Sequence, residues 1–229
     1  MKRGSYLVPP AIYNGTALHA NYMTADTIRV SFNTMAGNQP GTHKNFISIW
    51  QDNQSIPWAG KPLDTREMNV NTAKGVLLFD GLDLNKNSYI IGYSVGPVLE
   101  GVAQPYGNVC ASAFIPARSA GNNTDFTASL TLVYVGDNSV AFNFTLPDGA
   151  QPGTNGAWAG IWHAHQASYT VPPEMAVPIP VNTAFGTGVF NDYLIGRGLI
   201  YTIGLFMSGY HVNGRNIQTS LACSLTFTI

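Results

Sequence analysis

The 229-residue sequence predicts an all-β protein made of two tandem β-sandwich domains that arose by internal duplication. The duplication is visible in a motif, Gln39-Pro40-Gly41-Thr42, which recurs 112 residues later as Gln151-Pro152-Gly153-Thr154. Further matches follow at this spacing or within one residue of it: Tyr22 with Tyr134, Phe32 with Phe144, Ile49-Trp50 with Ile161-Trp162, Gly75-Val76 with Gly188-Val189, and Cys110 with Cys223. A match sustained over about 95 residues indicates a repeated structural unit.

Apolar and polar residues alternate with a period of two within each copy, which indicates strands rather than helices. In the first copy we expect strands at residues 17–22, 27–33, 46–51, 75–80, 88–95 and 109–115. In the second copy we expect them at 129–135, 139–146, 157–163, 188–193, 199–207 and 220–229. A further short strand is expected through 68–70 and through 175–179. The 24 glycines and 14 prolines separate these runs and leave no room for an amphipathic helix of ten residues.

Six or seven short strands in about 100 residues resemble an immunoglobulin-like or fibronectin III-like sandwich, although each copy has one cysteine rather than a pair. We expect an N-terminal domain over 1–116 and its repeat over 117–229, joined through the polar segment 116–124. The first sixteen residues have no counterpart in the second copy. They could form an extra edge strand or cover the second domain.

Composition excludes several classes of protein. Charged residues are 10% of the chain and the net charge is -1, so we expect no nucleic acid and no anionic membrane as partner. No apolar run is long enough to span a membrane. The opening residues lack the apolar region of a secretory signal, which predicts a cytoplasmic protein or one exported without a classical signal peptide. Two cysteines make no disulfide framework and are expected to be small core residues at equivalent positions.

Two motifs suggest catalysis or metal binding, and we interpret both as structural. Gly92-Tyr93-Ser94-Val95-Gly96 matches the nucleophile motif of serine hydrolases, but Ser94 falls late in an expected strand and no helix follows it. His163 and His165 would lie on one face of a strand, where two imidazoles can bind a metal. No third ligand is fixed near them, so we expect no metal, no cofactor and no catalytic residue.

Other shared features have structural explanations. Gln-Pro-Gly-Thr fits a type II turn, with glycine supplying the positive φ. The pairs Phe46/Trp50 and Trp158/Trp162 lie on one face of their strands. Either both faces of these strands are covered, by the partner domain or another chain, or the rings form an exposed strip for a ligand. Buried tryptophan is the commoner arrangement in sandwiches.

Recognition is expected at loops 148–156 and 208–216, which would emerge together at one end of the second sandwich. Tyrosine, asparagine and glycine are common in binding loops. We therefore expect a contact patch formed by Trp158, Tyr210, His211 and Arg215. The alternative is that Asn213-Gly214 simply forms a tight hairpin turn.

These observations favour a non-enzymatic interaction or assembly protein that self-associates as a homodimer or higher oligomer, because a neutral, aromatic-rich surface gives little charge repulsion. The alternative is a lectin-like module that binds a glycan or another small ligand. A hydrolase or metalloenzyme is the third and least favoured hypothesis.

Overall fold

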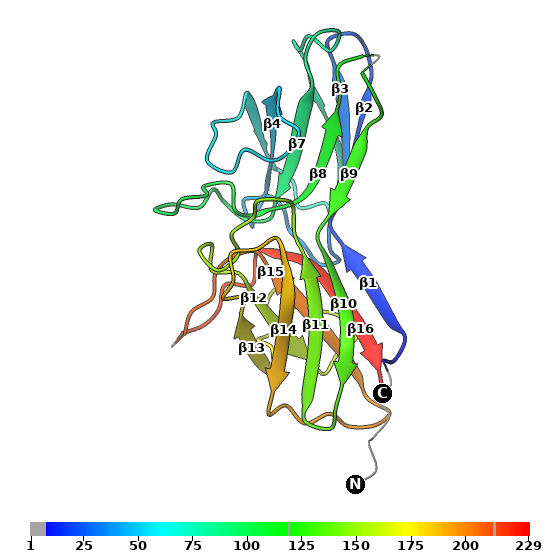
Figure 1. The fold of residues 1–229 in the computed structure, drawn as a ribbon, viewed down its shortest axis with the longest axis vertical. Helices are drawn as coiled ribbons and strands as arrows, with labels where there is room; N and C mark the ends of the chain where they lie inside the picture. The colour runs from blue at the N-terminus through cyan, green and yellow to red at the C-terminus, as the bar shows by residue number, and fades with distance from the viewer. Residues whose placement is uncertain (1–7, 119, 213) are drawn as a thin grey trace.

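The structure is a computed structural model that describes residues 8–118, 120–212 and 214–229. These residues form sixteen β-strands and no helix, and all strand pairs are antiparallel (Figure 1). The all-β prediction is therefore confirmed. No helix long and apolar enough to cross a membrane occurs in the described residues.

The strands form two units, each with a three-stranded and a five-stranded sheet, one above the other in Figure 1. In the first unit the sheets are β2(Ala17–Tyr22)-β3(Ile28–Asn33)-β6(Lys74–Phe79) and β5(Asp64–Glu67)-β4(Phe46–Gln51)-β7(Tyr89–Ser94)-β8(Val109–Ile115)-β9(Thr124–Thr127). In the second unit they are β10(Ser129–Val135)-β11(Ser139–Thr145)-β14(Phe185–Asn191) and β13(Met175–Pro178)-β12(Trp158–Trp162)-β15(Ile200–Phe206)-β16(Leu221–Thr228)-β1(Ala11–Gly15). The strand expected at 68–70 lies earlier, in β5, whereas the one expected at 175–179 corresponds to β13.

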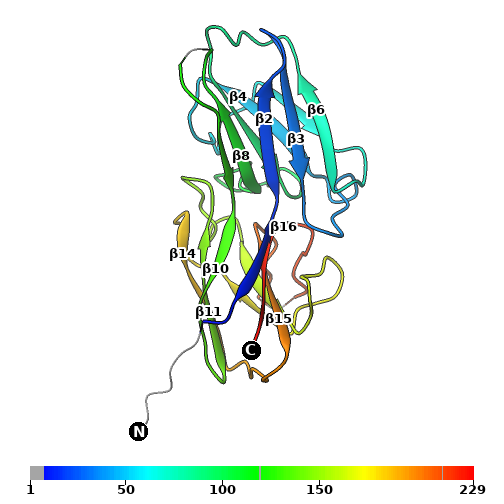
Figure 2. The same ribbon diagram turned by 90° about the vertical axis from the view of Figure 1, so that its right-hand side faces the viewer.

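In each five-stranded sheet, one outermost strand continues along the chain into the other unit. β1 pairs with β16 of the second unit and then runs on into β2 of the first unit (Figure 2). β9 pairs with β8 of the first unit and then continues into β10 of the second. The expectation of an extra edge strand near the N-terminus is confirmed. The expectation that this segment has no counterpart is wrong, because β9 takes the corresponding place.

The two crossings have the same geometry. The Thr16 N–H donates to Ala222 O at 3.0 Å, and the Ala128 N–H donates to Cys110 O at 2.8 Å. The crossing segments also contact each other, since His19 Nδ1 lies 2.5 Å from Asp125 Oδ2. The proposed boundary between 116 and 117 falls in the connection from β8 to β9, while sheet pairing crosses it in both directions.

Phenylalanine rings packed over glycines define the register of the three-stranded sheets. Phe32 lies opposite Gly75 and Phe144 lies opposite Gly186. A Cβ atom at these glycines would lie 2.5 Å and 2.7 Å from the Cζ atoms of the two rings, so only glycine fits. Gly75 therefore corresponds to Gly186, and its alignment with Gly188 in the sequence was wrong.

The shared Gln-Pro-Gly-Thr motif is fixed by an asparagine rather than by a type II turn. The Thr42 N–H donates to Asn71 Oδ1 at 2.9 Å, and the Thr154 N–H donates to Asn182 Oδ1 at 2.8 Å. Neither glycine of the motif has positive φ. A Cβ atom at Gly153 would lie 2.8 Å from Pro180 O, so the glycine is needed for close approach of two backbone segments.

The two cysteines are buried and free, as expected of core residues, but they are not at equivalent positions. Cys223 lies opposite Gly15 in β1, and Ala111 is the residue opposite Thr127 in β9. Cys110 is thus one residue out of register with Cys223. Burial raises the pKa of the Cys110 thiol to about 12, which keeps it protonated and unreactive at neutral pH.

Candidate functional site

Loops from both units meet at a groove of about 380 Å³, which we call the loop groove. Its walls are Gly96, Pro97 and Leu99 of the first unit and residues 154–156, 208–211, Ile217, Thr219 and Ser220 of the second. The Tyr210 N–H donates to Gly156 O at 3.0 Å, which joins the two loops of the second unit. The prediction that loops 148–156 and 208–216 lie together is confirmed. The sequence did not indicate that loop 96–108 of the first unit completes the same groove.

The buried amide of Gln104 connects the units beneath this groove. Gln104 Nε2 donates to Gly149 O at 2.9 Å, and its Oε1 accepts from the Gln151 N–H at 2.9 Å and from Asn155 Nδ2 at 3.1 Å. Trp58 Nε1 of the first unit also donates to Asp148 O at 2.9 Å. Residues 148–156 are thus held by side chains of the other unit, and Asn155 Oδ1 remains buried without a hydrogen-bond partner.

Trp158 has no exposed surface, with 0% of its area accessible, so it is not part of a contact patch as expected. Its ring stacks on Phe206 with a centroid distance of 3.9 Å, and its Nε1 donates to Ser208 O at 3.1 Å. Trp158 therefore supports the base of the loop that carries Tyr210. The physical reason is that β12 is covered on both faces.

The other three expected contact residues divide into two sets. Tyr210, half-buried, and His211, exposed, line the loop groove. Arg215 is exposed but lies away from the groove, where its Nη2 donates to Thr170 O at 3.2 Å. The hairpin turn expected at Asn213-Gly214 includes Asn213, which lies outside the described residues.

The aromatic pairs on β4 and β12 are buried by the loops that follow these strands. Trp50 Nε1 donates to Gly60 O at 2.8 Å, and Trp162 Nε1 donates to Val171 O at 2.9 Å. Phe46 is buried as well. The alternative in which both strand faces are covered is confirmed, and the cover comes from the chain itself.

The serine motif lies at the end of β7, where Ser94 Oγ is buried without a hydrogen-bond partner, and the histidine motif follows β12. Ser94 is buried at the end of β7, as expected of a strand position. The prediction that His163 and His165 share a strand face is wrong, because β12 ends at Trp162 and both histidines follow it in an exposed bend. In the described residues no three His, Cys, Asp or Glu side chains are grouped as metal ligands would be.

A polar cluster that the sequence did not indicate lies where the two units meet. Tyr93 OH donates to Asn45 Oδ1 at 3.0 Å, and His43 stacks on Tyr169 of the second unit with a centroid distance of 5.0 Å. Burial raises the pKa values of Tyr93 and Tyr169 well above their usual range, so both hydroxyls stay neutral. Asn45 Nδ2 and Tyr169 OH are buried without a partner. Only the folded chain brings these residues together.

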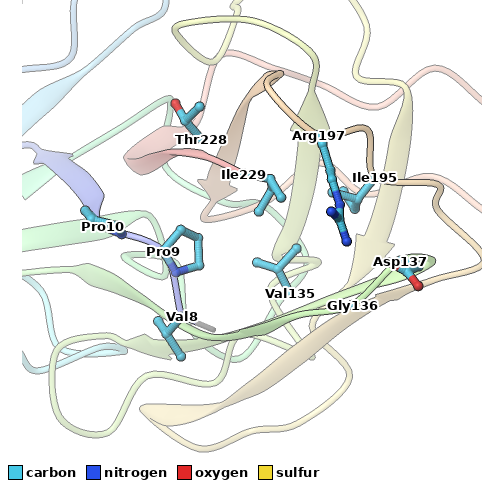
Figure 3. Close-up of a pocket in the computed structure, with 10 residues that line it drawn as sticks. All are labelled: Val8, Pro9, Pro10, Val135, Gly136, Asp137, Ile195, Arg197, Thr228 and Ile229. Atoms are coloured by element: carbon cyan, nitrogen blue, oxygen red, sulfur yellow. The ribbon is translucent and has the colours of Figure 1, made fainter. Parts of the chain in front are cut away.

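A larger cavity of about 560 Å³ lies where residues 8–10, 135–137 and 228–229 approach one another (Figure 3). Val8, Pro9 and Pro10 form one wall. Figure 3 shows Val135 and Ile229 pointing toward each other, with Arg197 extending beside them. Most of its lining residues are apolar, and Arg197 and Asp137 are the charged residues among them.

Comparison with known proteins adds no family. No family model matches the chain, and no curated protein matches it. Among solved structures it is similar to trypsin-activated alpha-2-macroglobulin from Escherichia coli, with 9% identity and a TM-score of 0.28. The match covers 96% of this chain and 17% of that one. A similarity of this size carries no information about function.

Proposed function

We propose that the chain is a non-enzymatic interaction and assembly protein, built of two immunoglobulin-like or fibronectin III-like sandwiches that arose by duplication. The shared strand order of the two units supports this origin. So do the matching Asn71–Thr42 and Asn182–Thr154 hydrogen bonds. Sandwiches of this kind are frameworks that carry binding surfaces in many proteins, and the particular function depends on those surfaces.

The observation that carries the proposal is the exchange of β1 and β9 between the units. Because each unit is completed by a strand that leads into the other, the surfaces of both are held in one orientation. Such preorganisation lowers the entropic penalty of binding a partner. With 10% charged residues, two copies also repel each other little. The proposed interaction is self-association, as a homodimer in its simplest form.

The test is sedimentation and light scattering of the full chain over a wide concentration range. We expect the mass to rise from that of one chain, 24.6 kDa, toward twice this value. A single-chain mass at every concentration would contradict self-association.

A second candidate function is lectin-like binding of a neutral glycan, and the loop groove is the observation that favours it. Thr154, Asn155 and Ser208 supply hydroxyl and amide groups, and Tyr210 supplies a ring beside them. Neutral sugars need such hydrogen bonds together with a flat apolar face. We expect Tyr210→Ala to abolish binding on a glycan array. The matched control is Arg215→Ala, because Arg215 extends toward Thr170 and not into the groove.

We further propose a cytoplasmic location or export without a classical signal. Two free, buried cysteines suit a reducing compartment. The proposed function requires no cofactor, no metal and no nucleic acid.

A further inference from the structure

The open sides of the two units correspond in position but differ in charge. We call residues 64–80, which contain β5 and β6, the charged edge, and residues 175–191, which contain β13 and β14, the uncharged edge. Ile49 faces Asp64 in the first unit, and Ile161 faces Met175 in the second. The registers of the three-stranded sheets give the same alignment, with Gly75 corresponding to Gly186.

The charged edge has five charged residues, Asp64, Arg66, Glu67, Lys74 and Asp80, and the uncharged edge has none. Met175, Val177, Pro178, Phe185 and Asn191 stand at the corresponding positions. On the charged edge, Arg66 Nε lies 2.9 Å from Asp64 Oδ2, and its guanidinium lies over the Phe79 ring. Charged side chains beside an edge strand hinder its pairing with another chain. The second unit lacks this protection.

Of the outer backbone groups of β14, Phe185 O accepts from Thr183 Oγ1 at 2.7 Å, and the others have no strand beside them in the described residues. The Leu146 N–H donates to Ala184 O at 2.6 Å, and antiparallel pairing alternates from there. Gly186 and Gly188 therefore direct their backbone groups toward β11, whereas Thr187 and Val189 direct theirs away from it. Among the described residues, no strand pairs with that side of β14. Its register against β11 is regular, without a bulge that would twist the edge away.

We infer that β14 of the uncharged edge pairs antiparallel with β14 of a second copy, about a two-fold axis at Gly188. This inference rests on the self-association proposed above and names its surface. Thr187 of each copy would pair with Val189 of the other, and Phe185, which is 72% exposed, would lie opposite Asn191. A second copy presents an identical unpaired strand without charge, so a two-fold contact satisfies both edges at once. The buried tryptophan pairs cannot provide this surface.

The first test introduces a charge at the centre of the contact. Thr187 is exposed on the outer face of β14, where its Oγ1 donates to Asn143 Oδ1 at 2.7 Å, so Thr187→Lys leaves the core intact while placing a charge beside Val189 of the second copy. Val76 holds the corresponding place on β6 and is also exposed, which makes Val76→Lys the matched control. In sedimentation equilibrium we expect Thr187→Lys to weaken dimerisation at least about tenfold and Val76→Lys to leave it unchanged.

A second variant keeps the edge neutral. Val189 directs its N–H away from β11, so Val189→Pro removes a donor that only the second copy would use. Circular dichroism and a thermal melt establish that each variant is folded. If wild-type chains associate and both folded variants associate equally well, the proposed surface is wrong while self-association stands. If wild-type chains never associate, self-association itself is wrong.

Discussion

The charged edge and the uncharged edge are the same structural segment with different outward-facing residues. Both keep the sequence Val-Asn-Thr-Ala, at 70–73 and 181–184, and both keep a glycine beneath a phenylalanine. These shared residues serve backbone contacts and core packing in both units. The charged positions, in contrast, face outward, and the corresponding positions of the second unit carry no charge. The framework therefore fixes the inward positions, and the outward positions are where the two units can acquire different interactions.

The interiors of the two three-stranded sheets differ as well, at one pair of facing residues. In the first unit Val30 lies opposite Leu77, and in the second Phe142 lies opposite Gly188. A Cβ atom at Gly188 would lie 2.2 Å from Phe142 Cζ. The first unit fills this site with two aliphatic side chains, and the second fills it with one ring beside a glycine, so both keep the site packed.

The largest effect, on the free energy of unfolding, is expected from placing the first-unit residue at only one position of this pair. Gly188→Leu forces a side chain into the Phe142 ring and should lower the free energy of unfolding by about 3 kcal/mol. Adding Phe142→Val recreates the first-unit pair and should restore much of this loss. Urea unfolding monitored by circular dichroism measures both. A double variant no more stable than Gly188→Leu alone would show that the two units pack differently here.

The next largest effect is expected from removing the charged side chains on and beside β6, the strand that corresponds to β14. The triple substitution Arg66→Val, Lys74→Phe and Asp80→Asn introduces the residues of the second unit at corresponding places. Each copy would then have two pairing edges and form assemblies beyond the dimer, seen by light scattering. We expect affinity to rise at least about tenfold, or about 1.4 kcal/mol. The control is Lys86→Phe, in the turn between β6 and β7 and outside residues 64–80. An unchanged mass distribution in the triple variant would contradict the prediction.

A smaller effect is expected at a left-handed backbone position that both units share. Lys44 has φ of 55°, and its counterpart Gly156 has φ of 69°. A Cβ atom at Gly156 would approach no atom closer than 3.7 Å, so only backbone strain opposes a side chain there. Gly156→Ala should lower stability by about 1 kcal/mol, and Lys44→Gly should raise it slightly. Thermal melts of both variants measure this, and a stabilising Gly156→Ala or a destabilising Lys44→Gly would refute the equivalence of the two turns.

Local patterns in the sequence predicted most strands, because alternating burial along a strand is a short-range property. The repeated Val-Asn-Thr-Ala sequence gives the correct alignment of β6 with β14. The more conspicuous match of Gly75-Val76 with Gly188-Val189 gave a wrong alignment. The exchange of β1 and β9 could not be predicted, because both strands look like ordinary edge segments and their partners depend on how the units meet.

The candidate site was predicted in part for the same reason. The proximity of loops 148–156 and 208–216 follows from their place in a sandwich. That Gln104 and loop 96–108 reach them depends on the arrangement of the two units, which leaves no trace in local spacing. Trp158 was misjudged because residue type does not show which strand face a later loop covers.

The smallest effect is expected on the way that folding stability depends on acidic pH. His43 and Asn155 hold corresponding places after the Gln-Pro-Gly-Thr motif, but only the first unit has a titratable side chain there. His43 Nδ1 lies 2.9 Å from Asn38 Oδ1, and burial lowers the His43 pKa below its usual value of 6.5. The folded protein therefore resists protonation of this imidazole, and the unfolded chain binds more protons as the pH falls below 6.5.

Stability should accordingly decrease as the pH falls through this range, and His43→Asn should reduce the decrease. The effect is small because the imidazole is only partly buried and solvent screens its charge. Urea unfolding at a series of pH values from neutral to about 5 measures it. His211→Asn, which removes an exposed histidine, is the control substitution. If His43→Asn and wild type lose stability in parallel, the contact between His43 and Tyr169 does not respond to acid, and the two units differ there only in side-chain shape.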